Sequence, residues 1–282
     1  MTGTGPLRCP CAGRYLQAAW TYGAPPEGET RFPALEGVAY RREVLRCDAC
    51  AHYVSRHDMD LGGIYDGAYV DATYGERMRE TFERIVSLPP ERSDNHGRVR
   101  RVVEAAGALL RAPMREGRPP AALDVGSGLC VFLHGLARHG WRCTALDPDP
   151  RAARHAREVV GVDAIAADAL RIDALGPYDL VALNKVAEHV PDPVALLERC
   201  AACLHPEGLL YIEVPDGDAA AAEGPGREEF FIEHHHAFSP ASLALAAARA
   251  GLSPVRIERL HEPSGKYTLA AFCTLAPAGQ VA

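Results

Sequence analysis

Long apolar runs are missing from this sequence of 282 residues, since no stretch approaches the ~20 apolar residues that a membrane-spanning helix needs. The N-terminal stretch MTGTGPLRCPCAGRYL also lacks the apolar core of a secretory signal peptide. Basic residues are not in excess, because the formal net charge is −7 and the sequence pI about 5.9. Proteins whose main partner is a nucleic acid usually carry a basic patch. We therefore expect a soluble, cytoplasmic protein that binds a small molecule, and neither a nucleic acid nor a membrane; its oligomeric state stays open.

Internal repeats are absent as well, but three regions differ in texture. Residues 1–62 carry two pairs of cysteines and short strand-like runs, and they are expected to form a cysteine-rich, zinc-binding module. Residues 63–118 have the apolar spacing of helices and predict a helical lid or linker. Residues 119–282 alternate strand-like and helix-like segments. The sequence thus predicts a small module followed by one large α/β domain.

The third region has the pattern of a mostly parallel sheet covered by helices on both faces. Strands are expected over residues 121–125, 141–146, 164–167, 178–183 and 208–214, with helices between most of them. Ser239 and Pro240 predict the start of a further helix, as N-cap and first-turn residues. The last two expected strands, 255–260 and 267–275, have no helix between them. They should form an antiparallel hairpin.

Glycines and acidic residues follow the expected strands of this region in a regular order. Gly126 and Gly128 follow the first strand, where glycine lets the backbone approach a ligand closely. Asp147 follows the second strand and can accept hydrogen bonds from two ribose hydroxyls, and Asp168 follows the third, where it can accept from an adenine amino group. Asn184 ends the fourth strand. Because open α/β sheets bind ligands beyond the carboxyl ends of their strands, these residues predict a nucleotide-like cofactor site.

A dinucleotide is the competing ligand for this glycine loop. A nicotinamide fingerprint requires a third small residue, where this chain has the bulkier Val131. A nicotinamide-dependent oxidoreductase is thus the weaker alternative. A non-catalytic protein that uses its cysteine module to bind another protein is a third alternative.

Residues 121–276 resemble a class I S-adenosylmethionine (SAM)-dependent methyltransferase, which has a Rossmann-like, seven-stranded sheet. The first motif of that superfamily is matched by LDVGSG, which starts at Leu123 and includes Asp124. The acidic segments around Asp147 and Asp168 resemble the next two motifs, and YDLVALN, ending at Asn184, resembles the fourth. Cys130 departs from the superfamily, because many members have a third glycine there. The resemblance implies SAM as the cofactor, held by Asp124, Gly126, Gly128, Asp147, Asp168 and Asn184.

The cysteine pairs of the first region have the spacing of metal ligands. Cys9 and Cys11 are separated by one residue, and Cys47 and Cys50 by two. Four thiolates from two close pairs can build a tetrahedral zinc site, which would help to order a segment with little core of its own. His52 could replace one thiolate. The alternative is four free thiols without a metal.

The same arrangement resembles the SAM-dependent sugar C-methyltransferases of natural-product pathways, which begin with two cysteine pairs. Glu233 and His234 resemble the Glu–His pair of that family, in which the pair acts with a histidine after the fourth strand in proton abstraction beside a carbonyl. The resemblance implies that His189, Glu233 and His234 are bases or substrate ligands. It favours C-methylation of a carbonyl-bearing, sugar-like acceptor, with O- or N-methylation of a secondary metabolite as the alternative.

Further candidates for the substrate site lie in two polar or aromatic segments. His235 and His236 extend the run that begins at His234. Three consecutive histidines could also bind a metal, although neighbours in an extended loop point in opposite directions. Tyr65, Tyr69 and Tyr74 precede the expected catalytic domain, where members of the superfamily often have an aromatic lid. The alternative for these tyrosines is packing between the module and the domain.

Overall fold

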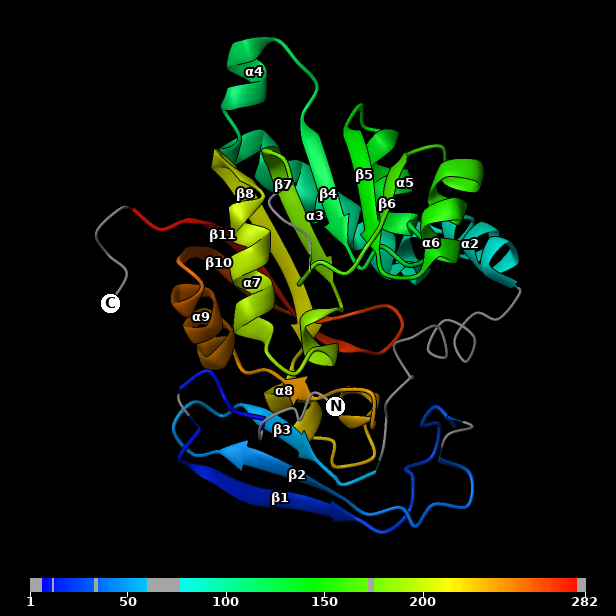
Figure 1. Ribbon diagram of the computed structural model, residues 1–282, viewed down its shortest axis with the longest axis vertical. Helices are drawn as coiled ribbons and strands as arrows, with labels where there is room; N and C mark the ends of the chain where they lie inside the picture. The colour runs from blue at the N-terminus through cyan, green and yellow to red at the C-terminus, as the bar shows by residue number, and fades with distance from the viewer. Residues whose placement is uncertain (1–6, 12, 33–34, 60–76, 172–174, 278–282) are drawn as a thin grey trace.

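Two β-sheets organise the chain in this computed structural model, which describes residues 7–11, 13–32, 35–59, 77–171 and 175–277. The larger sheet has seven strands in the order β10-β11-β8-β7-β4-β5-β6, and it occupies the upper part of Figure 1. Its strands are β4 (Ala121–Val125), β5 (Arg142–Asp147), β6 (Asp163–Ala166), β7 (Tyr178–Asn184), β8 (Leu204–Pro215), β10 (Leu252–His261) and β11 (Tyr267–Leu275). Strand β11 runs antiparallel to both of its neighbours, whereas the strands from β8 to β6 pair in parallel. The expected Rossmann-like sheet and its antiparallel hairpin are therefore confirmed.

Helices cover both faces of this sheet because successive strand residues point to opposite sides. Leu123, Val181 and Ile212 pack with helices α7 (Pro193–Ala202) and α9 (Pro240–Arg249) in one core. Ala122 and Tyr211 pack on the other side with α3 (Asp94–Leu109) and α5 (Val131–Ala137). The remaining helical elements are α2 (Met78–Val86), η4 (Pro90–Arg92), α4 (Ala112–Glu116), α6 (Pro150–His155), η5 (Ala156–Val160), η6 (Ala187–His189), α8 (Gly217–Ala221) and η7 (Glu228–Phe230). Within the described ranges, no helix is long and apolar enough to cross a membrane.

Side-chain caps fix where several of these helices begin. Ser93, Asp149 and Asp192 each accept a hydrogen bond from a backbone N–H in the first turn of α3, α6 and α7. Ser239 begins α9 with a reciprocal capping box to Ser242, as its position before Pro240 predicts. Such caps satisfy N–H groups that have no partner inside the helix.

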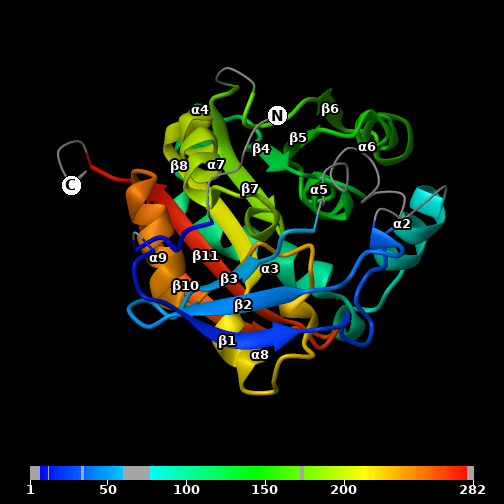
Figure 2. The same ribbon diagram turned by 60° about the horizontal axis from the view of Figure 1, so that its bottom comes forward.

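The smaller sheet joins the two ends of the chain's organisation. Its strands β1 (Leu16–Tyr22), β2 (Arg42–Cys47) and β3 (Tyr53–Arg56) are antiparallel, and Figure 2 brings them to the front. Its fourth strand, β9 (His236–Ala237), comes from the histidine run far along the sequence and pairs with β3. The small sheet therefore draws on both the expected module and the expected SAM-binding domain.

Candidate functional site

The loop after β4 brings the backbone close to its neighbours at the carboxyl edge of the large sheet. Gly126 has φ +72°, and a Cβ there would lie 2.7 Å from Cγ2 of Val186, in the loop that follows β7. Gly128 has φ +49°, but a Cβ there would meet no atom within 4 Å. The first glycine is thus required by packing, whereas the second faces open space that a ligand can approach.

The carboxylate of Asp147 lies beside this loop. One of its oxygens accepts from the Gly128 N–H at 2.8 Å, and the other from the Asp149 N–H at 2.9 Å. Burial raises the pKa of Asp147, and the two backbone N–H groups counteract that shift. Each carboxylate oxygen has a second lone pair, so Asp147 can still accept from the hydroxyls of a ligand. Asp168, after β6, is half-buried; it accepts from the Leu170 N–H at 2.9 Å and pairs with Arg171 at 3.3 Å.

Asp124 and Asn184 meet across the ends of β4 and β7. Nδ2 of Asn184 donates to Oδ1 of Asp124 at 2.7 Å, and burial raises the pKa of Asp124 to about 7. Oδ1 of Asn184 and Oγ of Ser127 are buried and have no hydrogen-bond partner among the described residues. Because unpaired buried polar atoms are costly, these two atoms point to a polar ligand at this edge. The structure thus brings the predicted cofactor residues to neighbouring strand ends.

A cavity of about 130 Å³ lies next to this edge. Lys185, which lines it, directly follows Asn184 in the sequence. Three segments enclose it: the loop from β7 to η6, the loop after α8 that contains η7, and the turn between β10 and β11. Its lining residues are Lys185, Glu188, His189, Pro215, Glu228, Glu229, Phe231, Glu233, His234, Lys266 and Tyr267. All three predicted catalytic residues therefore line one cavity.

His189 and His234 stand next to each other in this cavity, with ring centroids 4.8 Å apart. Nδ1 of His189 donates to the Glu233 carbonyl at 2.9 Å, and Nδ1 of His234 donates to the Glu229 carbonyl at 3.0 Å. Burial lowers the pKa of His189 to about 4 and that of His234 well below its usual value. Both rings are therefore neutral at pH 7, with the proton on Nδ1 and a lone pair on Nε2.

Glu188 completes this group, although the sequence predicted no catalytic or binding role for it. Its side chain is fully buried, and its carboxylate lies with the ring nitrogens of His189 and His234 in a cluster whose ligand atoms are all within 4.8 Å of one another. No other described residue donates a hydrogen bond to either of its oxygens. Burial raises the pKa of Glu188 to about 7. In the sequence, Glu188 belongs to the segment after the fourth strand that resembles the superfamily's motif, and nothing there indicates its burial.

The other predicted substrate residues have different surroundings. Oε1 of Glu233 accepts from the Thr30 hydroxyl at 3.4 Å. The backbone N–H of His235 donates to the Glu188 carbonyl, so His235 follows the cavity but does not line it. His236 is buried in β9, where Nδ1 lies 3.0 Å from Nε2 of His52. We therefore leave His236 out of the proposed substrate site. Tyr65, Tyr69 and Tyr74 lie outside the described residues.

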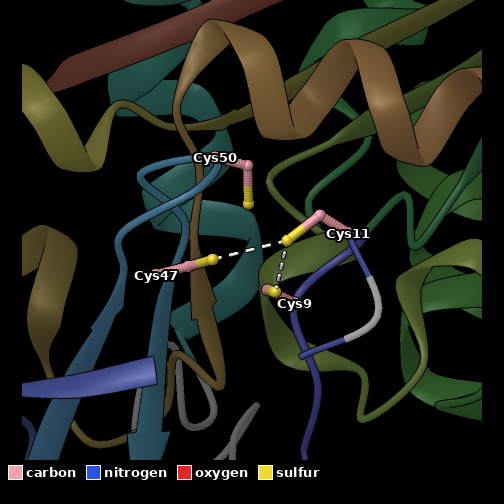
Figure 3. Close-up of side chains that lie close together, drawn as sticks. All are labelled: Cys9, Cys11, Cys47 and Cys50. Carbon is pink, nitrogen blue, oxygen red and sulfur yellow. Dashed lines mark hydrogen bonds between the residues drawn. The ribbon is translucent and has the colours of Figure 1, made fainter. Parts of the chain in front are cut away.

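The four predicted zinc ligands gather at one end of the small sheet (Figure 3). Sγ of Cys11 lies 3.1 Å from that of Cys9 and 3.4 Å from that of Cys47, and all four sulfurs lie within 4.8 Å of one another. Burial raises the pKa of Cys9 to about 11, whereas backbone N–H groups overcome burial and lower the pKa of Cys47 to about 7. Four sulfurs this close can share one tetrahedral ion at about 2.3 Å from each.

His52 does not join this sulfur cluster. Its Nδ1 lies 3.1 Å from the Ser242 hydroxyl, and its ring packs edge-on against Phe238. The imidazole thereby connects the small sheet to the start of α9. The donor set that fits zinc is the four thiols alone.

Comparisons with known proteins match the region that contains the predicted cofactor residues and the loop after β7. A family model described as "Methyltransferase domain" matches residues 94–257. A ubiquinone biosynthesis O-methyltransferase of Xylella fastidiosa is 34% identical over 119 residues, which cover 39% of this chain and 47% of the relative. One of Bordetella avium is 28% identical over 184 residues, which cover 58% of this chain and 72% of the relative. The chain spans less than half the length of the first relatives it matches.

Solved structures share the fold at low sequence identity. The 1,6-didemethyltoxoflavin-N1-methyltransferase of Burkholderia thailandensis, with bound S-adenosylhomocysteine, has a TM-score of 0.51 and 24% identity; the match covers 82% of this chain and 97% of the other. The magnesium protoporphyrin IX methyltransferase of Synechocystis has a TM-score of 0.55 and 15% identity, over 77% of this chain and 100% of the other. At these identities, the likeness concerns the fold alone.

Proposed function

The chain belongs to the methyltransferase domain family, and we propose that it transfers the methyl group of SAM to a small-molecule acceptor. The observation that carries this proposal is the buried carboxylate of Asp147 beside the open face of Gly128. There the carboxylate suits the ribose hydroxyls of SAM, and Asp168, at the next strand end, suits the adenine amino group. Oδ1 of Asn184 and Oγ of Ser127, which have no hydrogen-bond partner among the described residues, supply two further polar contacts. The family match gives the nicotinamide alternative no support.

The cavity beside this edge is the place we propose for the acceptor. SAM supplies an electrophilic methyl carbon when bound. The residues of the cavity must then hold the acceptor, exclude water and accept its proton. Nε2 of His189 and of His234 suit the last role, because carbonyls of the chain fix the proton of each ring on Nδ1. Lys185 lines the same cavity, and its Nζ donates to the Thr268 hydroxyl at 2.6 Å. Its positive charge would stabilise the negative charge that develops on the acceptor oxygen as the proton leaves.

We propose a hydroxyl oxygen as the methylated atom. The named activity of the relatives, O-methylation in ubiquinone biosynthesis, supports this choice. C-methylation beside a carbonyl is the second candidate. It is favoured because Glu233 and His234 both line the same cavity. The sugar-like acceptor and the natural-product pathway implied by the cysteine module stay predictions. For the four cysteines, we propose a structural zinc ion, since their thiols fit its tetrahedral geometry.

Calorimetric titration with S-adenosylhomocysteine tests the cofactor site. The intact protein should bind it with micromolar affinity, and Asp147→Ala should abolish that binding. Asp163→Ala, which removes an exposed carboxylate from the neighbouring strand β6, should bind as the wild type does. Absence of binding to the folded wild type, or equal binding by the Asp147 variant, would contradict the proposal.

Isotope labelling of the product tests the methylated atom. The protein is incubated with SAM that carries a ¹³C-methyl group and with acceptors that contain both a hydroxyl and a carbonyl. In the ¹³C NMR spectrum of the product, a labelled methyl group bonded to oxygen has the chemical shift of a methoxy group. That chemical shift is well separated from the shift of a methyl group bonded to carbon. A product with the label on carbon would replace the first candidate by the second.

A further inference from the structure

The group formed by Glu188, His189 and His234 has the composition of a metal site. Two imidazoles and one carboxylate are a ligand set that proteins use for divalent iron, manganese, cobalt and zinc. The three residues come from two separate segments, the η6 turn and the loop before β9, and they offer one ligand atom each within 4.8 Å of one another. Ligands at 2.0–2.2 Å from one ion lie roughly 3–4 Å apart, which this spacing allows.

The backbone already orients these ligands as it does in metal sites. The Glu233 carbonyl holds Nδ1 of His189, and the Glu229 carbonyl holds Nδ1 of His234. Such contacts fix the tautomer in which Nε2 is the ligand atom, and metal-bound histidines usually have them. Glu188 is fully buried, and no other described residue donates to its oxygens. A buried carboxylate without donors is costly, and a cation beside it would remove that cost.

The charges that line the cavity also favour a cation. Four carboxylates and two lysines line it. Glu228 pairs with Lys266 at 3.4 Å, and Glu229 pairs with Arg227 at 2.9 Å. Glu188 and Glu233 then share one remaining cation, Lys185, whose Nζ also donates to the Thr268 hydroxyl at 2.6 Å, so a formal excess of negative charge is left.

We propose that Glu188, His189 and His234 bind a divalent metal ion that holds the acceptor of the methyl group. Three protein ligands leave coordination positions open, so two neighbouring oxygens of one acceptor can bind together. The acceptor class is then a vicinal diol, a catechol or a hydroxy-carbonyl compound. Its reacting hydroxyl binds as the anion, having released its proton to solvent, since a bound metal ion lowers the pKa of a coordinated hydroxyl. This inference rests on the proposed function and makes the two histidines ligands in place of bases.

Manganese is the probe that separates this site from the cysteine cluster, because Mn²⁺ prefers oxygen and nitrogen ligands over thiolates. Free Mn²⁺ is followed by electron paramagnetic resonance during titration of the full-length protein. The wild type should bind one equivalent at the proposed site. Glu188→Gln should weaken binding at least tenfold, and His234→Asn should do the same. Asp163→Ala, which removes an exposed carboxylate of β6 that does not line the cavity, should bind Mn²⁺ within about twofold of the wild type.

Binding of S-adenosylhomocysteine to the same preparations shows that each variant is folded. A wild type that binds this cofactor product but no Mn²⁺ would refute the metal site and leave the proposed function standing. A wild type that binds Mn²⁺ but no cofactor product would refute the proposed function instead. Equal Mn²⁺ affinity of the wild type and both site variants would also overturn the metal site.

Discussion

The small sheet holds the cavity loop through a buried ion pair between Arg42 and Glu29, and this pair gives a sharp prediction. Nη2 of Arg42 lies 3.1 Å from Oε1 of Glu29, with both side chains at most 1% exposed. Nη1 of Arg42 donates to the Phe230 carbonyl at 2.5 Å, and Glu29 accepts from the Ile232 N–H at 2.8 Å. Both of those backbone groups belong to the loop that carries Glu233 and must be held for the cavity to keep its shape.

Arg42→Met leaves the Glu29 carboxylate buried without its cation and the Phe230 carbonyl without its donor. Breaking a buried pair costs about 3–5 kcal/mol, and an unsatisfied buried acceptor costs about 1–3 kcal/mol. The Tyr40 hydroxyl and the Ile232 N–H still donate to Glu29 in this variant. We therefore expect the lower end of both costs together, a loss of about 4 kcal/mol in the free energy of unfolding. For a chain of this size, that loss lowers Tm by about 10 °C.

Thermal unfolding measures this loss against two comparison variants. Arg56→Met removes an exposed arginine that pairs with Glu43 on the same sheet, and it should cost at most about 1 kcal/mol. The double variant Arg42→Met with Glu29→Gln removes the uncompensated charge and should recover about half of the loss, roughly 2 kcal/mol. Burial raises the pKa of Glu29 even beside Arg42. The cost of Arg42→Met should therefore be larger at pH 8 than at pH 5, since the carboxyl is more fully ionised at the higher pH.

The functional readout separates loop position from cofactor binding. Arg42→Met should raise KM for the acceptor and leave the affinity for S-adenosylhomocysteine unchanged, because Asp147 lies at the edge of the other sheet. A destabilisation equal to that of Arg56→Met would refute the reasoning. So would a parallel loss of cofactor affinity.

Three further predictions follow from single sites. Gly126→Ala should lower Tm by several degrees more than Gly140→Ala, since both positions have positive φ but a Cβ meets a neighbour only at the first; equal Tm values would contradict this. Zinc analysis should find one ion per chain fewer in Cys50→Ser than in Cys203→Ser, and equal zinc in both variants would exclude the cysteine cluster. Burial raises the pKa of Asp124 from 3.8 to about 7, so its contribution to stability is complete below about pH 4 and is lost as the pH rises through 7. Asp124→Asn should remove that part of the pH dependence of Tm, and an unchanged slope between about pH 5 and 8 would refute the assignment.

Local pattern determined the large sheet and the edge proposed for the cofactor. The alternation of strands and helices specifies the parallel sheet, and Gly126, Gly128 and Asp147 specify the loop and carboxylate at its edge. Both depend mainly on residues close to one another in the sequence. Backbone conformation at a glycine and the period of buried residues are set locally, and the parallel order of strands follows from short crossover connections. The antiparallel hairpin was visible for the same reason, as two strands with no helix between them.

The different positions of the three consecutive histidines were decided by tertiary structure alone. In sequence, His234, His235 and His236 are equivalent neighbours. Pairing of β9 with β3 buries His236 against His52, while His234 remains in the cavity. That outcome depends on contacts across more than 180 positions, which no local pattern encodes.

Glu188 and the Arg42–Glu29 pair were hidden for a related reason. A polar residue in a loop looks solvated in the sequence, and only the packing of distant segments around it removes the water. Burial then raises the pKa of Glu188, leaves its oxygens without a donor among the described residues and brings it beside His189 and His234. The sequence by itself determined the methyltransferase fold and the sheet edge at which we propose the cofactor site, whereas desolvation by the tertiary structure decided which polar groups form the cavity.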